Sequence, residues 1–153
     1  MKMEKVQYQT RAPVLHFVDD DDNWTYLFCD QFEKMAPEWE IICARDGISA
    51  KHQLACSSAP RVLVTDIDMP GMDGLQLAEW VKGKTELRSI PLFVFSNSTD
   101  PSRQQRCADL GVDRFIEKPT SMKDLRQAIR SIVKHCEENM PAPAEPVLLH
   151  TAN

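Results

Sequence analysis

The feature that most constrains the fold is a repeated alternation between short apolar runs and stretches with helical periodicity. The five apolar runs are Val14–Val18, Trp39–Ala44, Arg61–Thr65, Pro91–Phe95 and Phe115–Ile116. Between them, apolar residues recur three or four positions apart, which indicates amphipathic helices. Five strand–helix units predict a parallel sheet covered by helices on both faces. Right-handed crossovers then favour a doubly wound α/β domain with strand order 2-1-3-4-5.

Capping residues mark the ends of several predicted helices. A short helix is expected over Gly47–Cys56. Asp100 followed by Pro101 offers an N-cap and a proline in the first turn. Ser121, with Asp124 three residues later, resembles a capping box at the start of the last helix.

Polar side chains follow the predicted strands at the edge of the sheet where ligands bind in such folds. Asp19 and Asp20 come after the first strand, and Asp66 follows the third. Ser96 follows the fourth strand and Lys118 the fifth. Because strands 1, 3 and 4 are neighbours in the predicted order, these side chains are expected to converge.

These residue types together predict phosphoryl chemistry. Several carboxylates close together repel one another unless a cation is present, and hard oxygen ligands suit Mg²⁺. A carboxylate beside Mg²⁺ can attack phosphorus and form an aspartyl-phosphate. The transfer mainly needs neutralisation of the phosphoryl oxygens, to which the Lys118 ammonium and the Ser96 hydroxyl can contribute.

The same residues carry a resemblance to a known family. The segments that match are Val18-Asp19-Asp20, Asp66-Ile67-Asp68-Met69-Pro70-Gly71-Met72-Asp73-Gly74, Phe95-Ser96 and Glu117-Lys118-Pro119. In order and spacing they resemble the signature of response-regulator receiver domains of two-component signalling, over roughly Val14 to Cys136. The resemblance implies a flavodoxin-like fold and a stand-alone, single-domain regulator.

The resemblance also implies a role for each acidic residue. Asp66 is expected to be phosphorylated. Asp20 is expected to ligate Mg²⁺ directly, Asp19 largely through water, and Asp68 through its backbone carbonyl.

Three further residues receive roles from the resemblance. Lys118 is expected to contact the phosphoryl group, with a cis peptide bond to Pro119. Ser96 and Phe115 are expected to form a switch that remodels the face made by the fourth helix, fifth strand and fifth helix.

The expected partners are a sensor histidine kinase or histidine phosphotransfer protein, and a downstream protein. The only catalysis expected is autophosphorylation and slow autodephosphorylation.

The sequence departs from the family pattern at three positions. Asn97 stands where receivers usually carry Ala or Gly, and Asp68 where Asn is common. We expect both to alter the lifetime of the phosphate on Asp66 rather than abolish phosphorylation. Phe115 replaces a frequent Tyr, which removes a hydroxyl but keeps an aromatic switch.

Other readings of these residues remain open. Asp66 and Asp68 form an Asp-x-Asp that resembles haloacid-dehalogenase phosphatases, although no cap domain follows. A degenerate receiver that binds partners without phosphorylation is a further alternative. Asp21 and Asp22 are expected only to cap a helix, and His16 to be a core or rim histidine.

Composition limits the remaining functions. A net charge of −5 disfavours direct nucleic-acid binding. The sequence has no apolar run of the roughly 20 residues that span a bilayer, and Met1–Arg11 lacks the apolar segment of a signal peptide. Five cysteines without metal-ligand spacing are expected to be reduced and mainly buried, which fits a cytoplasmic protein. We expect an N-terminal extension over 1–11, a receiver domain over 12–137 and a Pro/Ala-rich tail over 138–153.

Overall fold

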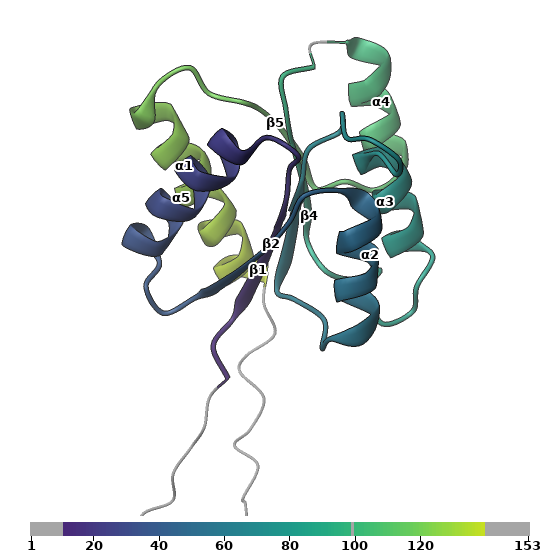
Figure 1. Ribbon diagram of the computed structural model, residues 1–153, viewed down its shortest axis with the longest axis horizontal. Coiled ribbons are helices and arrows are strands. Elements are labelled where there is room, and N and C mark those ends of the chain that lie inside the picture. The colour runs from purple at the N-terminus through teal and green to yellow at the C-terminus, as the bar shows by residue number, and fades with distance from the viewer. Residues whose placement is uncertain (1–10, 99, 140–153) are drawn as a thin grey trace, which may run out of the picture.

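The computed structural model describes residues 11–98 and 100–139, which form a five-stranded sheet with five helices (Figure 1). The strands are β1 (Val14–Val18), β2 (Glu40–Ala44), β3 (Val62–Thr65), β4 (Leu92–Ser96) and β5 (Arg114–Glu117). The helices are α1 (Asp22–Met35), α2 (Gly47–Cys56), α3 (Gly74–Lys82), α4 (Pro101–Asp109) and α5 (Met122–Asn139). All strand pairs are parallel, in the order β2-β1-β3-β4-β5. The predicted doubly wound, flavodoxin-like order is confirmed.

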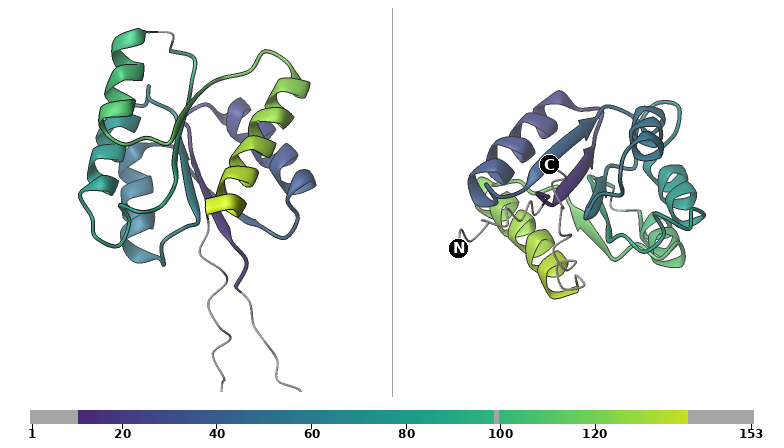
Figure 2. Two further views of the ribbon diagram at one scale, coloured as in Figure 1. Left: turned by 180° about the vertical axis from the view of Figure 1, so that it is seen from behind. Right: turned by 90° about the horizontal axis from the view of Figure 1, so that it is seen from below.

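Helices cover both faces of the sheet, with α1 and α5 on one side and α2, α3 and α4 on the other (Figures 1 and 2). Side chains of a strand alternate between the two faces. In β4, Phe93 and Phe95 join the core beneath α1 and α5, whereas Val94 packs toward α3 and α4. Because both of their faces are covered, the three central strands β1, β3 and β4 are almost entirely buried and largely apolar, whereas the edge strands β2 and β5 carry exposed residues.

An aromatic cluster fills the α1/α5 side of the sheet. Phe28 of α1 stacks on Phe17 of β1 with ring centroids 4.2 Å apart, and lies 5.7 Å from Phe95. Trp39 was predicted to start the second strand but precedes β2, where its ring packs 6.0 Å from that of Phe32. Each large apolar side chain buried in this way contributes about 1.5–3 kcal/mol.

Aspartates cap four of the five helices. Asp21, Asp46, Asp73 and Asp100 each accept a backbone N–H of the first turn, which satisfies donors that the helix leaves free. The capping role predicted for Asp21 is therefore confirmed. At α5, the Asp124 N–H donates to Ser121 Oγ at 3.1 Å, at the predicted start.

The two ends of the described region bear on the predicted boundaries. Helix α5 continues to Asn139, two residues beyond the expected domain end at 137. Residues 1–10 and 140–153, which make up most of the two expected end segments, lie outside the described residues. Within residues 11–98 and 100–139, no helix combines the length and apolarity needed to cross a bilayer.

Buried polar and thiol side chains give a mixed outcome. His16 is buried in β1 with its Nε2 2.6 Å from Gln53 Oε1, as expected for a core histidine. The expectation that the cysteines are mainly buried is wrong. Cys107 and Cys136 are buried, but Cys29 and Cys43 are half-buried and Cys56 is exposed. The last three lie on α1, the edge strand β2 and the end of α2, where fewer layers cover them.

Candidate functional site

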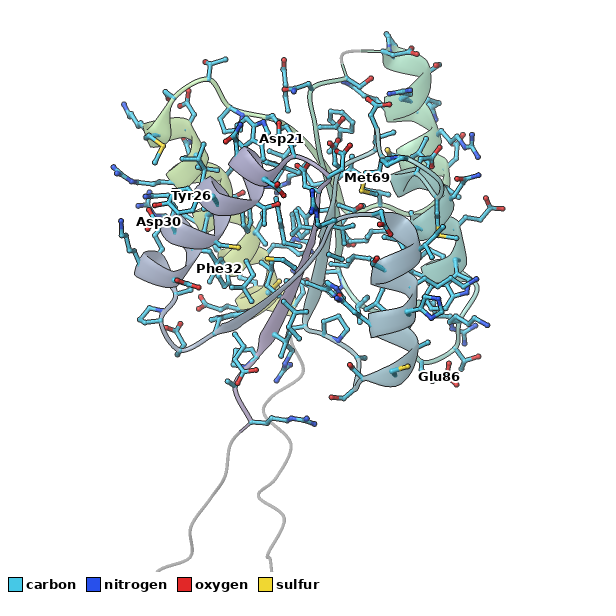
Figure 3. The ribbon with its side chains drawn as sticks, in the orientation of Figure 1. Asp21, Tyr26, Asp30, Phe32, Met69 and Glu86 are labelled. Carbon is cyan, nitrogen blue, oxygen red and sulfur yellow. The ribbon has the colours of Figure 1, made fainter. Side chains whose placement is uncertain are left out.

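The carboxyl ends of the strands bring most of the predicted site residues to one edge of the sheet. Asp19 directly follows β1 and Asp66 directly follows β3, and the Asp66 N–H donates to the Val18 carbonyl at 2.9 Å. Lys118 follows β5, where its N–H donates to the Ser96 carbonyl at 3.0 Å. Figure 3 marks this end of the molecule with Asp21 and Met69, whereas Glu86 lies toward the opposite end.

Lys118 joins two of the carboxylates. Its Nζ lies 3.0 Å from Asp66 Oδ2 and 2.8 Å from Asp19 Oδ2, and the residue is only 6% exposed. Burial alone would lower the pKa of this ammonium group, but the neighbouring carboxylates of Asp19 and Asp66 raise it. Lys118 therefore stays positively charged while it holds the two acids together.

Asp66 is fixed at both carboxylate oxygens. The Ile67 N–H donates to Oδ1 at 2.7 Å, while Lys118 contacts Oδ2. Gly74 lets α3 start directly against this loop, because a Cβ at Gly74 would overlap the Asp66 carbonyl oxygen. The Gly74 N–H donates to the Ile67 carbonyl at 2.9 Å. The Asp73-Gly74 sequence at the start of α3 thus helps to position the candidate nucleophile, in addition to making a turn.

The acidic cluster fits a hard divalent cation. Oxygen atoms of Asp19, Asp20 and Asp66 lie within 4.8 Å of one another. Asp19 Oδ1 accepts the Asp21 N–H at 2.9 Å. Asp19 Oδ2 is buried and forms an ion pair with Lys118, but it has no partner in hydrogen-bond geometry among the described residues.

The charge on Asp19 is also unfavourable as the site stands. Burial, with a smaller contribution from the neighbouring Asp66 charge, raises the pKa of Asp19 to about 6, although Lys118 offsets part of this effect. A buried carboxylate with a free lone pair, next to two other carboxylates, is a suitable oxygen ligand for Mg²⁺. The ligand roles of individual residues, including the Asp68 carbonyl, stay predictions.

The predicted switch residues lie on one face of the sheet but on different strands. Ser96 is the last residue of β4 rather than the first after it; it is fully buried, and its Oγ accepts the Ser98 N–H at 3.3 Å. Phe115 pairs with Val94 across β4 and β5 and is half-buried in the cluster that contains Cys107. Both therefore face the side of the sheet that α4 covers.

Two residues near the site had no functional role in the sequence analysis. Arg103, the third residue of α4, holds both oxygens of the Asp68 carboxylate through its Nη1, at 2.7 and 2.9 Å. Trp24 of α1, counted only as part of an apolar stripe, lies with its ring centroid 5.4 Å from Lys118 Nζ. A sequence signal for Arg103 and Trp24 did exist. Each is the third residue of its helix, and the first turns of these helices lie next to the carboxyl ends of the strands.

One expectation about the backbone is wrong. No peptide bond within residues 11–98 and 100–139 is cis, so the Lys118–Pro119 bond is trans. The amide before a proline favours trans by about 0.5–1 kcal/mol. Lys118 reaches both carboxylates with this trans bond.

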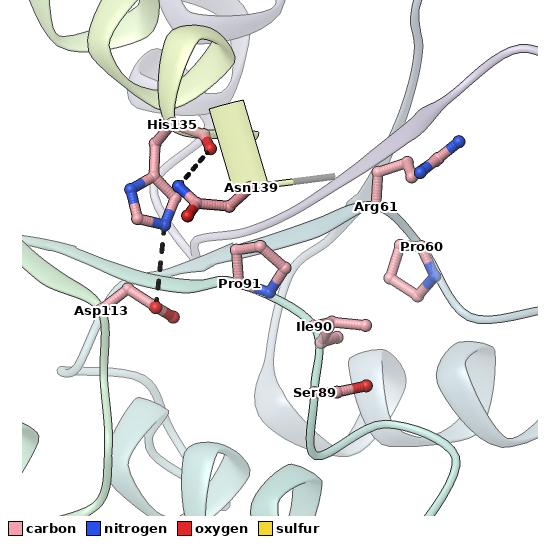
Figure 4. A pocket seen from close by; sticks show the side chains of 8 residues that line it. All are labelled: Pro60, Arg61, Ser89, Ile90, Pro91, Asp113, His135 and Asn139. Carbon is pink, nitrogen blue, oxygen red and sulfur yellow. Dashed lines mark hydrogen bonds and ion pairs between the residues drawn. The ribbon is translucent and has the colours of Figure 1, made fainter. Parts of the chain in front are cut away.

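An open pocket of about 310 Å³ lies at the opposite end of the sheet, where β3, β4 and β5 begin (Figure 4). Asp113 Oδ1 and His135 Nε2 lie 3.7 Å apart at its wall. None of the predicted site residues lines this pocket. The residues predicted to carry phosphoryl chemistry lie instead at the carboxyl ends of the strands.

The sequence is similar to known signalling proteins. The family described as response regulator receiver domain matches residues 15–130. The polar-differentiation response regulator DivK of Brucella anthropi is 31% identical over 74% of this chain and 90% of its own length. The two-component response regulator ORR4 of Oryza sativa subsp. indica is 30% identical over 70% of this chain. That match takes in 49% of the rice protein, so the chain spans about half the length of this relative.

Solved structures agree in fold. The phosphorylated cyanobacterial phytochrome response regulator RcpA superposes with a TM-score of 0.79 at 23% identity, over 88% of this chain and all of that one. The Mn²⁺-bound form of response regulator Rcp1 gives a TM-score of 0.76 at 24% identity, over 86% and 99% of the two chains. Taken with the family match over most of its length, these findings show that the chain belongs to the response regulator receiver domain family.

Proposed function

We propose that this receiver domain accepts a phosphoryl group on Asp66 and uses it to change how it binds a partner. The observation that carries the proposal is the contact of Lys118 with both Asp66 and Asp19, at the edge of the sheet where Asp20 also lies. A buried cation beside a cluster of carboxylates is the arrangement that stabilises charge on a transferring phosphoryl group.

In the transfer step, an oxygen of Asp66 attacks the phosphorus of a phosphorylated donor. The new oxygen–phosphorus bond forms as the bond to the leaving group breaks, and the leaving group takes that electron pair. The Lys118 ammonium lies close enough to Asp66 Oδ2 to neutralise an oxygen of the incoming group. The Ile67 N–H holds the other carboxylate oxygen, so the nucleophile keeps one orientation.

Asp19, Asp20 and Asp66, with the backbone carbonyl of Asp68, would hold Mg²⁺. When bound, Mg²⁺ supplies further neutralisation of the phosphoryl oxygens. The buried carboxylate of Asp19 supports this assignment, since burial beside Asp66 makes its charge unfavourable even with the Lys118 ammonium nearby. Receivers in this family use an acidic pocket for a divalent ion, and Rcp1 is a Mn²⁺-bound example among the structural neighbours.

The output is proposed to be a shift in population between two states of the α4–β5–α5 face. A phosphoryl group on Asp66 would draw the Ser96 hydroxyl toward it and let Phe115 move inward. Arg103 would respond as well, because new negative charge arises close to its present partner Asp68. The proposed partners are a sensor histidine kinase or histidine phosphotransfer protein, and a downstream protein.

The position of Asp68 supports a receiver over an Asp-nucleophile phosphatase. In the phosphatase alternative, Asp68 would act as the acid for chemistry at Asp66. Its side chain is 62% exposed and is held by Arg103 instead. A carboxylate in this position is better suited to tuning phosphate lifetime than to proton transfer.

Intact-mass spectrometry after incubation with Mg²⁺ and acetyl phosphate tests the proposal. We expect one added phosphoryl group on the wild type and on Asp68→Asn, and none on Asp66→Asn. Asp68→Asn is the matched control, since it removes the neighbouring carboxylate and leaves Asp66. Labelling of Asp66→Asn, or steady turnover of a generic phosphomonoester, would contradict the assignment.

Asp68 and Asn97, the two residues beside the site that depart from the family pattern, can be tested in a second measurement. Asn97 is exposed next to Ser96, and Asp68 is tied to Arg103. We expect the phosphate on Asp68→Asn/Asn97→Ala to have a different lifetime from that on the wild type. Equal lifetimes would remove the proposed role of these residues.

A further inference from the structure

Two cysteines from different elements meet on the side of the sheet covered by α1. Cys29 of α1 and Cys43 of the edge strand β2 have their Sγ atoms 3.1 Å apart. They are fourteen residues apart in sequence. In Figure 3, Phe32, three residues after Cys29, lies on the side of α1 toward the sheet, whereas Tyr26 and Asp30 lie outward.

We propose that Cys29 and Cys43 form a reversible disulfide, a redox modification site distinct from the phosphorylation site. The separation of the two sulfurs exceeds the length of a disulfide bond by only about 1 Å. The two sulfurs therefore need to approach each other by only about this distance for the bond to form.

Solvent access distinguishes this pair from ordinary packing. Cysteine often serves as a small apolar side chain, as the buried Cys107 and Cys136 do here. Cys29 and Cys43 are instead half-buried, and β2 is the edge strand of the sheet. A small oxidant can reach such a pair, whereas it cannot reach the two buried thiols.

The contact also polarises the two thiols. Hydrogen bonding between them lowers the pKa of Cys43, and the same contact, with burial, raises the pKa of Cys29. The S–H of one cysteine can therefore stabilise a thiolate on the other, and the thiolate is the reactive form.

A hydroperoxide can supply the two-electron oxidation that the bond requires. A thiolate on one of the two cysteines attacks an oxygen of hydrogen peroxide, the O–O bond breaks, and water leaves after protonation. The resulting sulfenic acid is attacked by the sulfur of the other cysteine, which gives up its proton. The S–O bond breaks, a second water leaves, and two thiols have been oxidised by two electrons. A low-molecular-weight thiol reverses the bond by exchange.

The consequence of the bond is a covalent tie between α1 and the edge of the sheet. It closes the stretch of chain that contains the end of α1 and the turn into β2. The unfolded chain loses conformational freedom, so the oxidised protein should melt at a higher temperature than the reduced one.

Peptide mapping of the wild type after treatment with stoichiometric hydrogen peroxide tests the site. Under non-reducing conditions we expect a single cross-linked peptide pair that contains Cys29 and Cys43, and its loss on addition of dithiothreitol. The intact protein should lose two hydrogen masses and rise in melting temperature. Cys29→Ser and Cys43→Ser should each lose the cross-link and this rise.

Cys56→Ser is the matched control, because Cys56 is the exposed cysteine and lies outside the pair. The Cys56→Ser variant should form the Cys29–Cys43 cross-link as the wild type does. It should lose only the disulfides that Cys56 forms between two protein molecules. Oxidation confined to Cys56, or over-oxidation of Cys29 or Cys43 without a bond between them, would overturn the proposal. Circular dichroism of each variant shows that it is folded when compared.

Discussion

Helices α4 and α5 lie on either side of β5 in the chain, yet they are attached to the sheet very differently. Of the nine residues of α4, all of them described, Cys107 alone is buried. Helix α5 buries Leu125, Ile129, Ile132 and Cys136 in the aromatic core. Arg126 of α5 also donates to Gln31 of α1 at 2.7 Å. The difference indicates which helix can move at low energetic cost.

The site lies between these two regions. Trp24 of α1, on the anchored side, lies beside Lys118. On the other side, the ion pair Arg103–Asp68 joins α4 to the loop that follows β3 and contains Asp66. A signal that starts at Asp66 is therefore expected to move α4 before α5.

Truncation of one core residue on each helix should show the largest difference. Ile129→Ala on α5 should lower the free energy of unfolding by about 2–5 kcal/mol, because it opens a cavity in the core. Cys107→Ala on α4 should cost about 1 kcal/mol, since it removes one small buried group. Urea denaturation measures both losses of stability. Equal losses would show that α4 and α5 are attached to the sheet equally firmly.

Removal of the charge of Asp19, which contacts Lys118 next to Trp24, should have the next largest effect on stability. The folded pKa of Asp19, about 6, lies above its unfolded value of 3.8. The folded chain thus binds more protons between these values, and the stability from this group falls as pH rises across that window. At pH 7.5 without metal, Asp19→Asn should raise the free energy of unfolding by about 1–3 kcal/mol.

Asp19→Asn also distinguishes two explanations for the acidic cluster, a cation site and simple repulsion between carboxylates. Mg²⁺ should raise the melting temperature of the wild type and have little effect on Asp19→Asn. Melting in EDTA and in Mg²⁺ gives both values. An equal Mg²⁺ response in the two proteins would exclude Asp19 from the cation site.

Loss of the ion pair between α4 and Asp68 should have the smallest effect on stability. Arg103→Gln removes an exposed pair, so the free energy of unfolding should change by less than about 1 kcal/mol. Amide exchange at the start of α4 should nevertheless become faster, because the tie to the loop is gone. Lys134→Gln on α5, which also breaks an exposed pair, is the control and should leave α4 unchanged.

The fold could be predicted from the sequence almost completely, because its signals are periodic and local. The apolar runs mark β1, β3 and β4 to within one residue, and the bounds of α2 match as predicted. Trp39 was misplaced because an aromatic residue before a strand and one within it have the same local pattern. Only the tertiary contact with Phe32 distinguishes them.

The candidate site was predictable in part. The rule that ligands bind at strand ends brought Asp19, Asp66 and Lys118 together from sequence alone. It could not reveal the Arg103–Asp68 pair or the meeting of Cys29 with Cys43. Arg103 and Asp68 are 35 residues apart, and Cys29 and Cys43 lie on consecutive elements, but in both cases the contact depends on how the elements pack, which no spacing in the sequence encodes.

Hydrogen–deuterium exchange with and without phosphorylation tests whether a phosphoryl group on Asp66 changes α4 more than α5. The wild type is compared before and after treatment with acetyl phosphate and Mg²⁺, with Asp66→Asn treated in parallel. We predict altered exchange in α4 and β5 of the wild type, little change in the buried turns of α5, and none in Asp66→Asn. A change confined to α5, or the same change in Asp66→Asn, would contradict the account.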